Sequence, residues 1–143
     1  MSKLIAISTG LKDVEMAPGN IPCVVINNDF VKACNNFGNN AVIFGPHENS
    51  ELVDISKFDA IVISGGGDIN PATYGEDKIE KTIRVSDYRD STELAMLKSA
   101  EENNVKTLAI CRGHQLLNIY KGGSLYQDLK DNGFTQIDHE KPF

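Results

Sequence analysis

The stretch Leu108-Ala109-Ile110-Cys111-Arg112-Gly113 decides the fold. Its apolar residues predict a buried strand, and residues 112–120 carry the pattern of a helix that is closed by Gly122-Gly123. A strand that passes directly into a helix is the repeating unit of α/β proteins. The stretch therefore predicts an α/β fold.

The same alternation of strand and helix runs along the whole chain. Further strands are expected at residues 4–7, 41–44 and 60–63, and further helices at 28–37, 86–103 and, as a short one, 50–57. The strands are continuous apolar runs, as expected when helices cover both faces of a sheet. We therefore predict a three-layer sandwich with a mostly parallel, flavodoxin-like sheet.

The remaining segments are predicted to be irregular. Residues 10–22 read as a loop because they hold two glycines and two prolines, and residues 68–85 show no period. Residues 125–129 fit a short strand or a turn. Asp87 and Asp90 resemble a capping box at the start of the helix over 86–103, in which Leu94, Leu97 and Ala100 line one face.

Length and composition narrow the classes of function. The 143 residues fit one domain, 1–143, and the formal net charge of −6 without a basic cluster argues against nucleic acid as a partner. No apolar run approaches the roughly 20 residues that span a bilayer, and no signal-peptide layout opens the chain. With only three cysteines and no disulfide framework, we expect a cytoplasmic protein with reduced thiols.

Cys111 is the first candidate for chemistry. It lies between a predicted strand and a predicted helix, which is the layout of a nucleophile elbow, and Gly113 permits a tight turn. The free N–H groups and the dipole of the helix favour the thiolate. The alternative interpretation, a small buried hydrophobe, has equal weight for Cys111 and is preferred for Cys23 and Cys34.

The second candidate is the glycine loop, Ser64-Gly65-Gly66-Gly67-Asp68, which also follows a strand. Its backbone N–H groups can approach a phosphate or an oxyanion. The loop matches neither nucleotide-binding pattern, because no Lys-Ser/Thr follows it and its glycine spacing differs. A plain tight turn is the competing interpretation. The histidine spacings match no zinc pattern, so we expect no metal and no cofactor.

Together these motifs resemble the class I glutamine amidotransferase superfamily, in particular its γ-glutamyl-γ-aminobutyrate hydrolase-like branch. The resemblance covers essentially the whole chain and is clearest over residues 58–129. Four ordered motifs carry it: the glycine loop with its continuation to Glu76, Arg89-Asp90 with Glu93-Leu94, Cys-Arg-Gly-x-Gln at 111–115, and Gly-Gly-x-Leu-x-Gln-Asp-Leu at 122–129.

The resemblance implies that Cys111 attacks a γ-glutamyl amide and forms a γ-glutamyl thioester, which water then hydrolyses. It implies an oxyanion hole made by the backbone N–H groups of Gly66 and Arg112, with Gly67 as the alternative to Gly66. Gln115 would help to hold the glutamyl group. The implied substrate is a small γ-glutamyl compound, glutamine or a γ-glutamyl amine.

The sequence departs from this family at the catalytic base. Relatives complete a Cys-His-Glu triad through a His-Pro-Glu-like motif that is absent from these residues, and His139 matches a non-catalytic histidine of the family. His114 stands three residues beyond Cys111, so helical geometry directs it away from the elbow. We therefore expect the chain to be the N-terminal portion of the family fold, with a further segment or a separate chain supplying His and Glu.

Two other interpretations stay open at this point. The chain fits a non-catalytic remnant that binds glutamine or a γ-glutamyl compound, and it fits a glutaminase subunit that delivers ammonia to a synthetase. A nucleotide-binding module is the least favoured interpretation, because the glycine loop lacks the usual lysine. An incomplete sheet would expose an edge and apolar surface, which would favour self-association.

Overall fold

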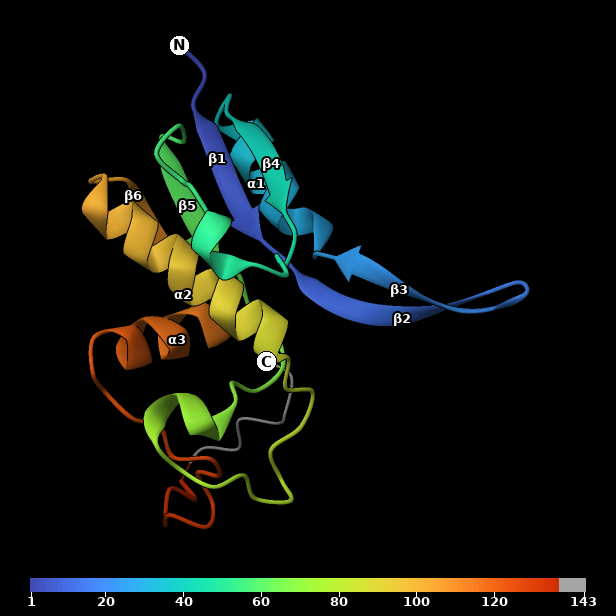
Figure 1. Cartoon of the computed structure of the whole chain (residues 1–143), viewed down its shortest axis with the longest axis vertical. Helices are drawn as coiled ribbons and strands as arrows, with labels where there is room; N and C mark the ends of the chain where they lie inside the picture. Colours follow the sequence, from blue (N-terminus) through green and yellow to red (C-terminus); the bar gives the residue numbers. More distant parts are fainter. Residues whose placement is uncertain (137–143) are drawn as a thin grey trace.

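A parallel sheet of strand order β4-β1-β5-β6 forms the centre of the molecule (Figure 1). The structure is a computed structural model and describes residues 1–136. The strands of this sheet are β1 (Leu4–Ser8), β4 (Asn40–Phe44), β5 (Ala60–Ile63) and β6 (Lys106–Ala109). The helices are α1 (Asn28–Asn36), α2 (Asp87–Glu102) and α3 (Arg112–Tyr120).

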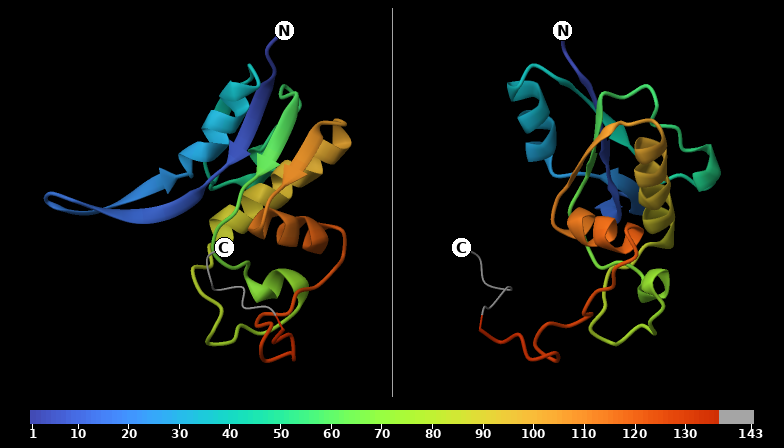
Figure 2. Two further views of the ribbon diagram at one scale, coloured as in Figure 1. Left: turned by 180° about the vertical axis from the view of Figure 1, so that it is seen from behind. Right: turned by 90° about the vertical axis from the view of Figure 1, so that its left-hand side faces the viewer.

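Helices cover both faces of this sheet. Helix α1 lies on one face, and α2 and α3 lie on the other (Figure 2). All the strand pairings in the sheet are parallel, as the continuous apolar runs predicted. The architecture is therefore α/β and agrees with the predicted flavodoxin-like three-layer sandwich.

The apolar core lies between the sheet and the α2–α3 layer. Ile61 and Ile63 of β5 point into it and are fully buried, as are Met96 of α2 and Leu116 of α3. The predicted apolar face of α2 is present, because Leu97 and Ala100 are buried there. This core fixes the carboxyl end of β5 against the start of α3, where both predicted motifs lie.

The prediction of a loop over residues 10–22 is wrong. The segment forms an antiparallel hairpin of β2 (Gly10–Met16) and β3 (Gly19–Val25), joined by the two-residue turn Ala17-Pro18, and it projects away from the sheet (Figure 1). The prediction failed because prolines usually mark loops. Here Pro18 lies in the turn, and Pro22 lies in a strand of a two-stranded ribbon, whose edges tolerate a missing N–H.

Two shorter segments also differ from the expectations. The helix expected at 50–57 is a single 3₁₀ turn, η1 (Ser50–Leu52), and the irregular segment 68–85 holds another, η2 (Pro71–Tyr74). Of the two alternatives for residues 125–129, the strand is absent, and a turn begins at Leu129. Cys23 and Cys34 are half-buried rather than buried, because neither the hairpin nor α1 is covered on its outer side.

Contrary to the prediction, strand β6 is not buried on both faces. It is an outer strand of the sheet, and Leu108 is 56% exposed, with Ile110 just after the strand 38% exposed. Within residues 1–136, nothing pairs with its free edge. The described helices include none with the length and apolar content that crossing a membrane requires.

Candidate active site

Cys111 lies in a sharp turn between β6 and α3, as the sequence predicts. Its backbone angles are φ 54° and ψ −112°, a conformation that is uncommon for any residue other than glycine. Helix α3 begins at the next residue, and Cys111 itself is exposed. Backbone strain of this kind is concentrated at functional sites, because the surrounding structure must enforce it.

Gly113 explains how the turn can be so tight. A Cβ atom at this position would lie 2.2 Å from the carbonyl oxygen of Ile63. Only glycine therefore lets the first turn of α3 pack directly on the end of β5. The elbow depends on this close approach between a helix and a neighbouring strand.

The glycine loop lies against the elbow. A Cβ atom at Gly65 would lie 3.6 Å from Cys111 Cβ, and one at Gly66 would lie 3.3 Å from Arg112 Cδ. The backbone N–H groups of Gly66, Gly67 and Arg112 donate no hydrogen bond to any atom of residues 1–136. The two predicted motifs thus meet, and the structure leaves these donors available.

A buried network of ion pairs surrounds the side chain of Arg112, the residue that follows Cys111 in the elbow. Both guanidinium branches of Arg112 are engaged, one by Glu93 and the other by Asp90, and all three side chains are at most 3% exposed. Asn70 N donates to the second oxygen of Asp90 at 2.8 Å. Burial raises the pKa of the Asp90 carboxyl, against the opposing effects of Asn70 and Arg112.

The same network reaches the glycine loop through Arg89. Its Nε donates to Glu93 Oε1 at 2.9 Å, and its Nη2 donates to Ser64 O, Ser64 Oγ and Gly65 O at 3.1, 3.0 and 2.9 Å. Ser8 Oγ donates to Glu93 Oε1 at 2.6 Å and accepts from Ser64 N at 2.9 Å. One carboxylate, Glu93, therefore ties together β1, α2, α3 and the loop.

Sequence reasoning found only part of this network. The family resemblance singled out Arg89-Asp90, but it gave the side chain of Arg112 no role. The N-cap of α2 is Ser86, whose hydroxyl accepts from Arg89 N at 3.4 Å, and not Asp87 as the capping-box prediction held. Asp87 instead accepts from Asn70 Nδ2 at 2.6 Å. The available signal was the clustering of Arg89, Asp90 and Glu93 within five residues of a helix whose inward face is buried.

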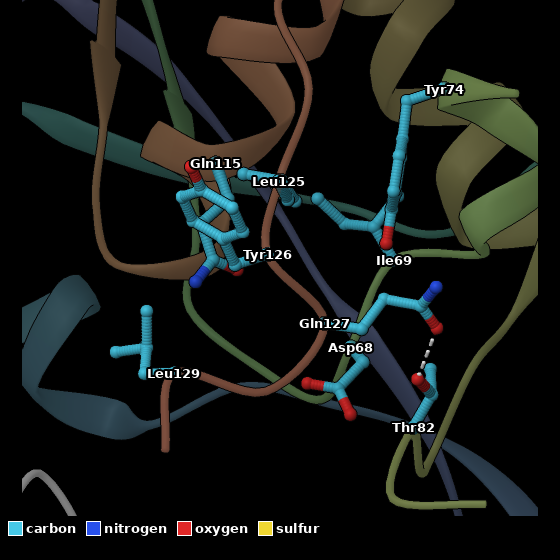
Figure 3. Close-up of a pocket in the computed structure, with 9 residues that line it drawn as sticks. All are labelled: Asp68, Ile69, Tyr74, Thr82, Gln115, Leu125, Tyr126, Gln127 and Leu129. Carbon is cyan, nitrogen blue, oxygen red and sulfur yellow. Dashed lines mark hydrogen bonds between the residues drawn. The ribbon is translucent and has the colours of Figure 1, made fainter. Parts of the chain in front are cut away.

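Gln115 lies one helical turn beyond Cys111 and lines a small cavity of about 140 Å³. Figure 3 shows Gln115 beside Leu125 and Tyr126, with Asp68 and Gln127 on the opposite wall. Thr82 Oγ1 donates to Gln127 Oε1 at 2.8 Å and so links residues 79–83 to the 122–129 motif. The last two predicted motifs thus share one cavity.

No histidine that the structure describes hydrogen-bonds to the sulfur of Cys111. His114 is exposed in the first turn of α3, and His47 Nδ1 accepts from Asn49 N at 3.0 Å, far along the chain from the elbow. His139 lies outside the described residues. Within residues 1–136, no group of three or more His, Cys, Asp or Glu side chains is placed to hold a metal ion.

Comparisons with known proteins identify the family of the chain. The sequence model of the Peptidase C26 family matches residues 3–142. A glutamine amidotransferase-like protein of Lactococcus lactis, YvdE, is 39% identical over 112 residues, which are 77% of this chain and 47% of that protein. A protein of Mycobacterium tuberculosis that is named as a glutamine amidotransferase is 32% identical over 90% of this chain and 42% of its own length.

A third relative carries a more specific name. The γ-glutamyl-γ-aminobutyrate hydrolase of Escherichia coli O157:H7 is 34% identical over 76 residues, which are 52% of this chain and 29% of the enzyme. The chain thus spans about half the length, or less, of the curated relatives it matches. From its fold, its elbow and glycine loop, and the match over residues 3–142, the chain belongs to the Peptidase C26 family, within the class I glutamine amidotransferase-like superfamily.

Proposed function

We propose that Cys111 is the nucleophile in the hydrolysis of a γ-glutamyl amide. The observation that carries this proposal is the place of Cys111: an exposed thiol in a positive-φ turn, at the start of a helix and against a loop of three glycines. The family role in γ-glutamyl amide chemistry agrees with it. A cysteine that served only packing would be buried in a relaxed backbone.

The thiolate of Cys111 attacks the γ-carbonyl carbon, and the C–N bond to the leaving amine breaks after that amine has gained a proton. A γ-glutamyl thioester remains, and water then hydrolyses it to glutamate and the free thiol. The N–H groups of Gly66 and Arg112 stabilise the oxyanion in both steps, with Gly67 as the alternative to Gly66. Gln115 holds the glutamyl group from the cavity that it lines.

We also propose that a second polypeptide segment completes the site. The reaction needs a base, and in residues 1–136 no side chain hydrogen-bonds to the sulfur of Cys111. Strand β6 offers a free edge, and the exposed Leu108 and Ile110 lie just before the nucleophile. A segment that pairs with this edge and covers these side chains would bring its own residues to Cys111.

Hydrolysis of γ-glutamyl-p-nitroanilide tests the proposal. The 143-residue chain is assayed alone and together with the C-terminal half of the Lactococcus lactis relative, either mixed or fused. We expect turnover only in the completed protein, and loss of turnover in Cys111→Ala but not in the matched variant Cys34→Ala. Turnover that survives Cys111→Ala would exclude this nucleophile.

A further inference from the structure

Arg89 holds the glycine loop from outside the loop. It lies in the first turn of α2, and its Nη2 donates to Ser64 O at 3.1 Å and to Gly65 O at 2.9 Å. Residues 65–67 are all glycine, so the loop has no side chain with which to fix its own backbone there. A side chain of the helix thus binds two successive carbonyl groups of the loop.

The hydrogen bond to Gly65 O sets the direction of the next N–H group. Gly65 and Gly66 share one peptide unit, which is trans, because the cis peptide of residues 1–136 is Ala17-Pro18. In a trans peptide the C=O and the N–H point to opposite sides of the chain. Gly65 O points toward Arg89, so Gly66 N–H points away from Arg89, where it meets no acceptor of residues 1–136.

The following peptide unit lacks such a bond. Within residues 1–136, Gly66 O accepts no hydrogen bond, and no hydrogen bond therefore fixes the direction of Gly67 N–H. The family resemblance leaves Gly66 and Gly67 as alternatives for the oxyanion hole. The hydrogen bonds separate them, because only the N–H of Gly66 belongs to a peptide that a side chain orients.

Arg89 is itself held in place. Its Nε donates to Glu93 Oε1 at 2.9 Å, and its side chain is 7% exposed. Glu93 is 1% exposed and also accepts from Ser8 Oγ and from Arg112. The backbone N–H of Arg112 is the second proposed donor of the oxyanion hole. One buried carboxylate thus fixes the side chain that orients the first donor and the side chain of the residue that carries the second.

Gly66 lies directly on the guanidinium group of Arg89. A Cβ atom at Gly66 would lie 2.2 Å from Arg89 Nη1 and 3.1 Å from Arg89 Cζ, so only glycine allows this approach. Gly65 contacts the elbow, since a Cβ atom there would lie 3.6 Å from Cys111 Cβ. The peptide that Arg89 orients therefore lies between its guanidinium group and the proposed nucleophile's turn.

We propose that Arg89 is a positioning residue for the oxyanion hole. By binding Gly65 O, it turns Gly66 N–H toward the oxygen that becomes negative when Cys111 attacks the γ-carbonyl carbon. This inference rests on the proposed function and deepens it, because it assigns the donor to Gly66 and its orientation to α2. A donor that is oriented before the reaction stabilises the developing charge without reorganising. Arg89 touches no substrate and moves no proton.

Replacement of Arg89 by lysine tests this role. Lysine keeps the charge beside Glu93, but one ammonium group cannot reproduce the fork that binds Glu93 and the loop carbonyls together. In the completed protein, Arg89→Lys should lower kcat for γ-glutamyl-p-nitroanilide by about 100-fold, the order of loss for a group misplaced by about 1 Å. KM should not change, because the lost interaction exists only in the transition state.

Ser99→Ala is the matched control for a loss of stability. Ser99 lies ten residues further along α2, and its buried hydroxyl accepts from Ile55 N at 3.0 Å. Its removal should lower the urea midpoint of the protein but leave kcat at the parent value. A similar fall of kcat in Ser99→Ala, or a parent kcat in Arg89→Lys, would overturn the inference.

Alkylation of Cys111 separates positioning from general damage to the elbow. Iodoacetamide reacts with a thiolate by displacement and forms no oxyanion, so its rate reports on the thiol alone. We expect Arg89→Lys to be alkylated at Cys111 at the parent rate, measured by peptide mass spectrometry. An alkylation rate that falls as much as kcat would show a disrupted elbow and would also overturn the inference.

A backbone measurement separates this inference from the proposed function. NMR relaxation of the 143-residue chain gives the order parameter of Gly66 N–H without any turnover. We expect the value of a rigid backbone, about 0.85, in the parent chain and a fall toward about 0.6 in Arg89→Lys. Equal values would overturn the inference even if Cys111 forms a thioester. A fall without any thioester in the completed parent protein would show that Arg89 orients the loop and that the proposed reaction fails.

Discussion

The carbonyl oxygen of Ile63 leaves no room for a side chain at residue 113. Gly→Ala changes within helices usually stabilise a protein by about 1 kcal/mol. Here the added Cβ would lie 2.2 Å from that oxygen. Because the oxygen belongs to the backbone of β5, it can move away only if the elbow opens. The close approach that shapes the elbow therefore reverses the usual sign of this substitution.

We predict that Gly113→Ala lowers the free energy of unfolding by roughly 1–3 kcal/mol, the usual cost of overpacking. Urea unfolding followed by circular dichroism measures this change. Gly19→Ala is the matched control, because a Cβ atom there meets nothing within 4 Å. A Gly113→Ala protein as stable as the parent chain would show that α3 does not pack on β5 in this way.

Thiol reactivity offers a second test at the scale of one residue. Cys111 is exposed, whereas Cys23 and Cys34 are half-buried. We predict that a limiting amount of iodoacetamide modifies Cys111 first, because attack requires access to the sulfur. Peptide mass spectrometry identifies the site. Preferential labelling of Cys34 would be incompatible with the exposed elbow.

At the scale of elements, Glu93 joins α2 to α3, to β1 and, through Arg89, to the glycine loop. Its carboxylate accepts from Ser8, Arg89 and Arg112, and the side chain is 1% exposed. Removing one partner of a buried network leaves an uncompensated buried charge, which is far more costly than the loss of a surface ion pair.

We predict that Glu93→Gln lowers the free energy of unfolding by roughly 3–5 kcal/mol, because two buried arginines lose a shared counter-charge. Glu102→Gln on the same helix is the control. Glu102 is 61% exposed, so its change should be within about 0.5 kcal/mol. Equal midpoints in urea for the two variants would contradict the role assigned to the network.

The start of the sheet carries a pH-dependent contact. Asp59 precedes β5 and accepts from Leu4 N at 2.8 Å and from Lys3 Nζ at 3.0 Å. The backbone N–H of Leu4, and then Lys3, hold the pKa of Asp59 below its ordinary value of 3.8. A carboxyl with a depressed pKa stabilises the folded state above its unfolded pKa, and this contribution is lost as the pH falls through the folded value.

We therefore predict that Asp59→Asn lowers the melting temperature at pH 6 and that the difference from the parent chain shrinks on acidification below about pH 4. Thermal unfolding at a series of pH values measures it. Asp13→Asn, an exposed carboxylate of the projecting hairpin, should follow the parent chain throughout. A difference that grows as the pH falls would have the wrong sign for this contact.

The elements of the sheet and its helices could be predicted because their residues carry strong local signals. Apolar runs of three or four residues mark the strands, and α3 begins at the predicted residue. The hairpin over 10–25 was not predicted, because its glycines and prolines mimic a loop, although its two strands pair with each other across a two-residue turn. The 3₁₀ turns η1 and η2 are too short to show a period.

The candidate site was predictable in its backbone but not in its charges. Cys111 and the glycine loop stand out in the sequence because glycines and a strand end mark them. The side chains of the ionic network around Arg112 are brought together from β1, the glycine loop, α2 and α3. Such long-range placement depends on the packing of the sheet, which local patterns do not encode.

At the scale of the whole molecule, the elbow, the glycine loop and the cavity lined by Gln115 lie at the carboxyl ends of the strands, where parallel α/β sheets place their sites. Strand β6, which leads into Cys111, is an outer strand of the sheet and exposes Leu108. The proposed nucleophile and a free strand edge are thus neighbours along the chain. A segment that completes the sheet there would also complete the site.

Trapping the acyl intermediate tests the central claim most directly. The completed protein is mixed with a γ-glutamyl amide, quenched in acid within one turnover, and analysed by peptide mass spectrometry. We predict a mass increase of one γ-glutamyl group on the peptide that contains Cys111, and none in Cys111→Ala. Rapid hydrolysis without any acylated Cys111, or acylation at another residue, would contradict the account.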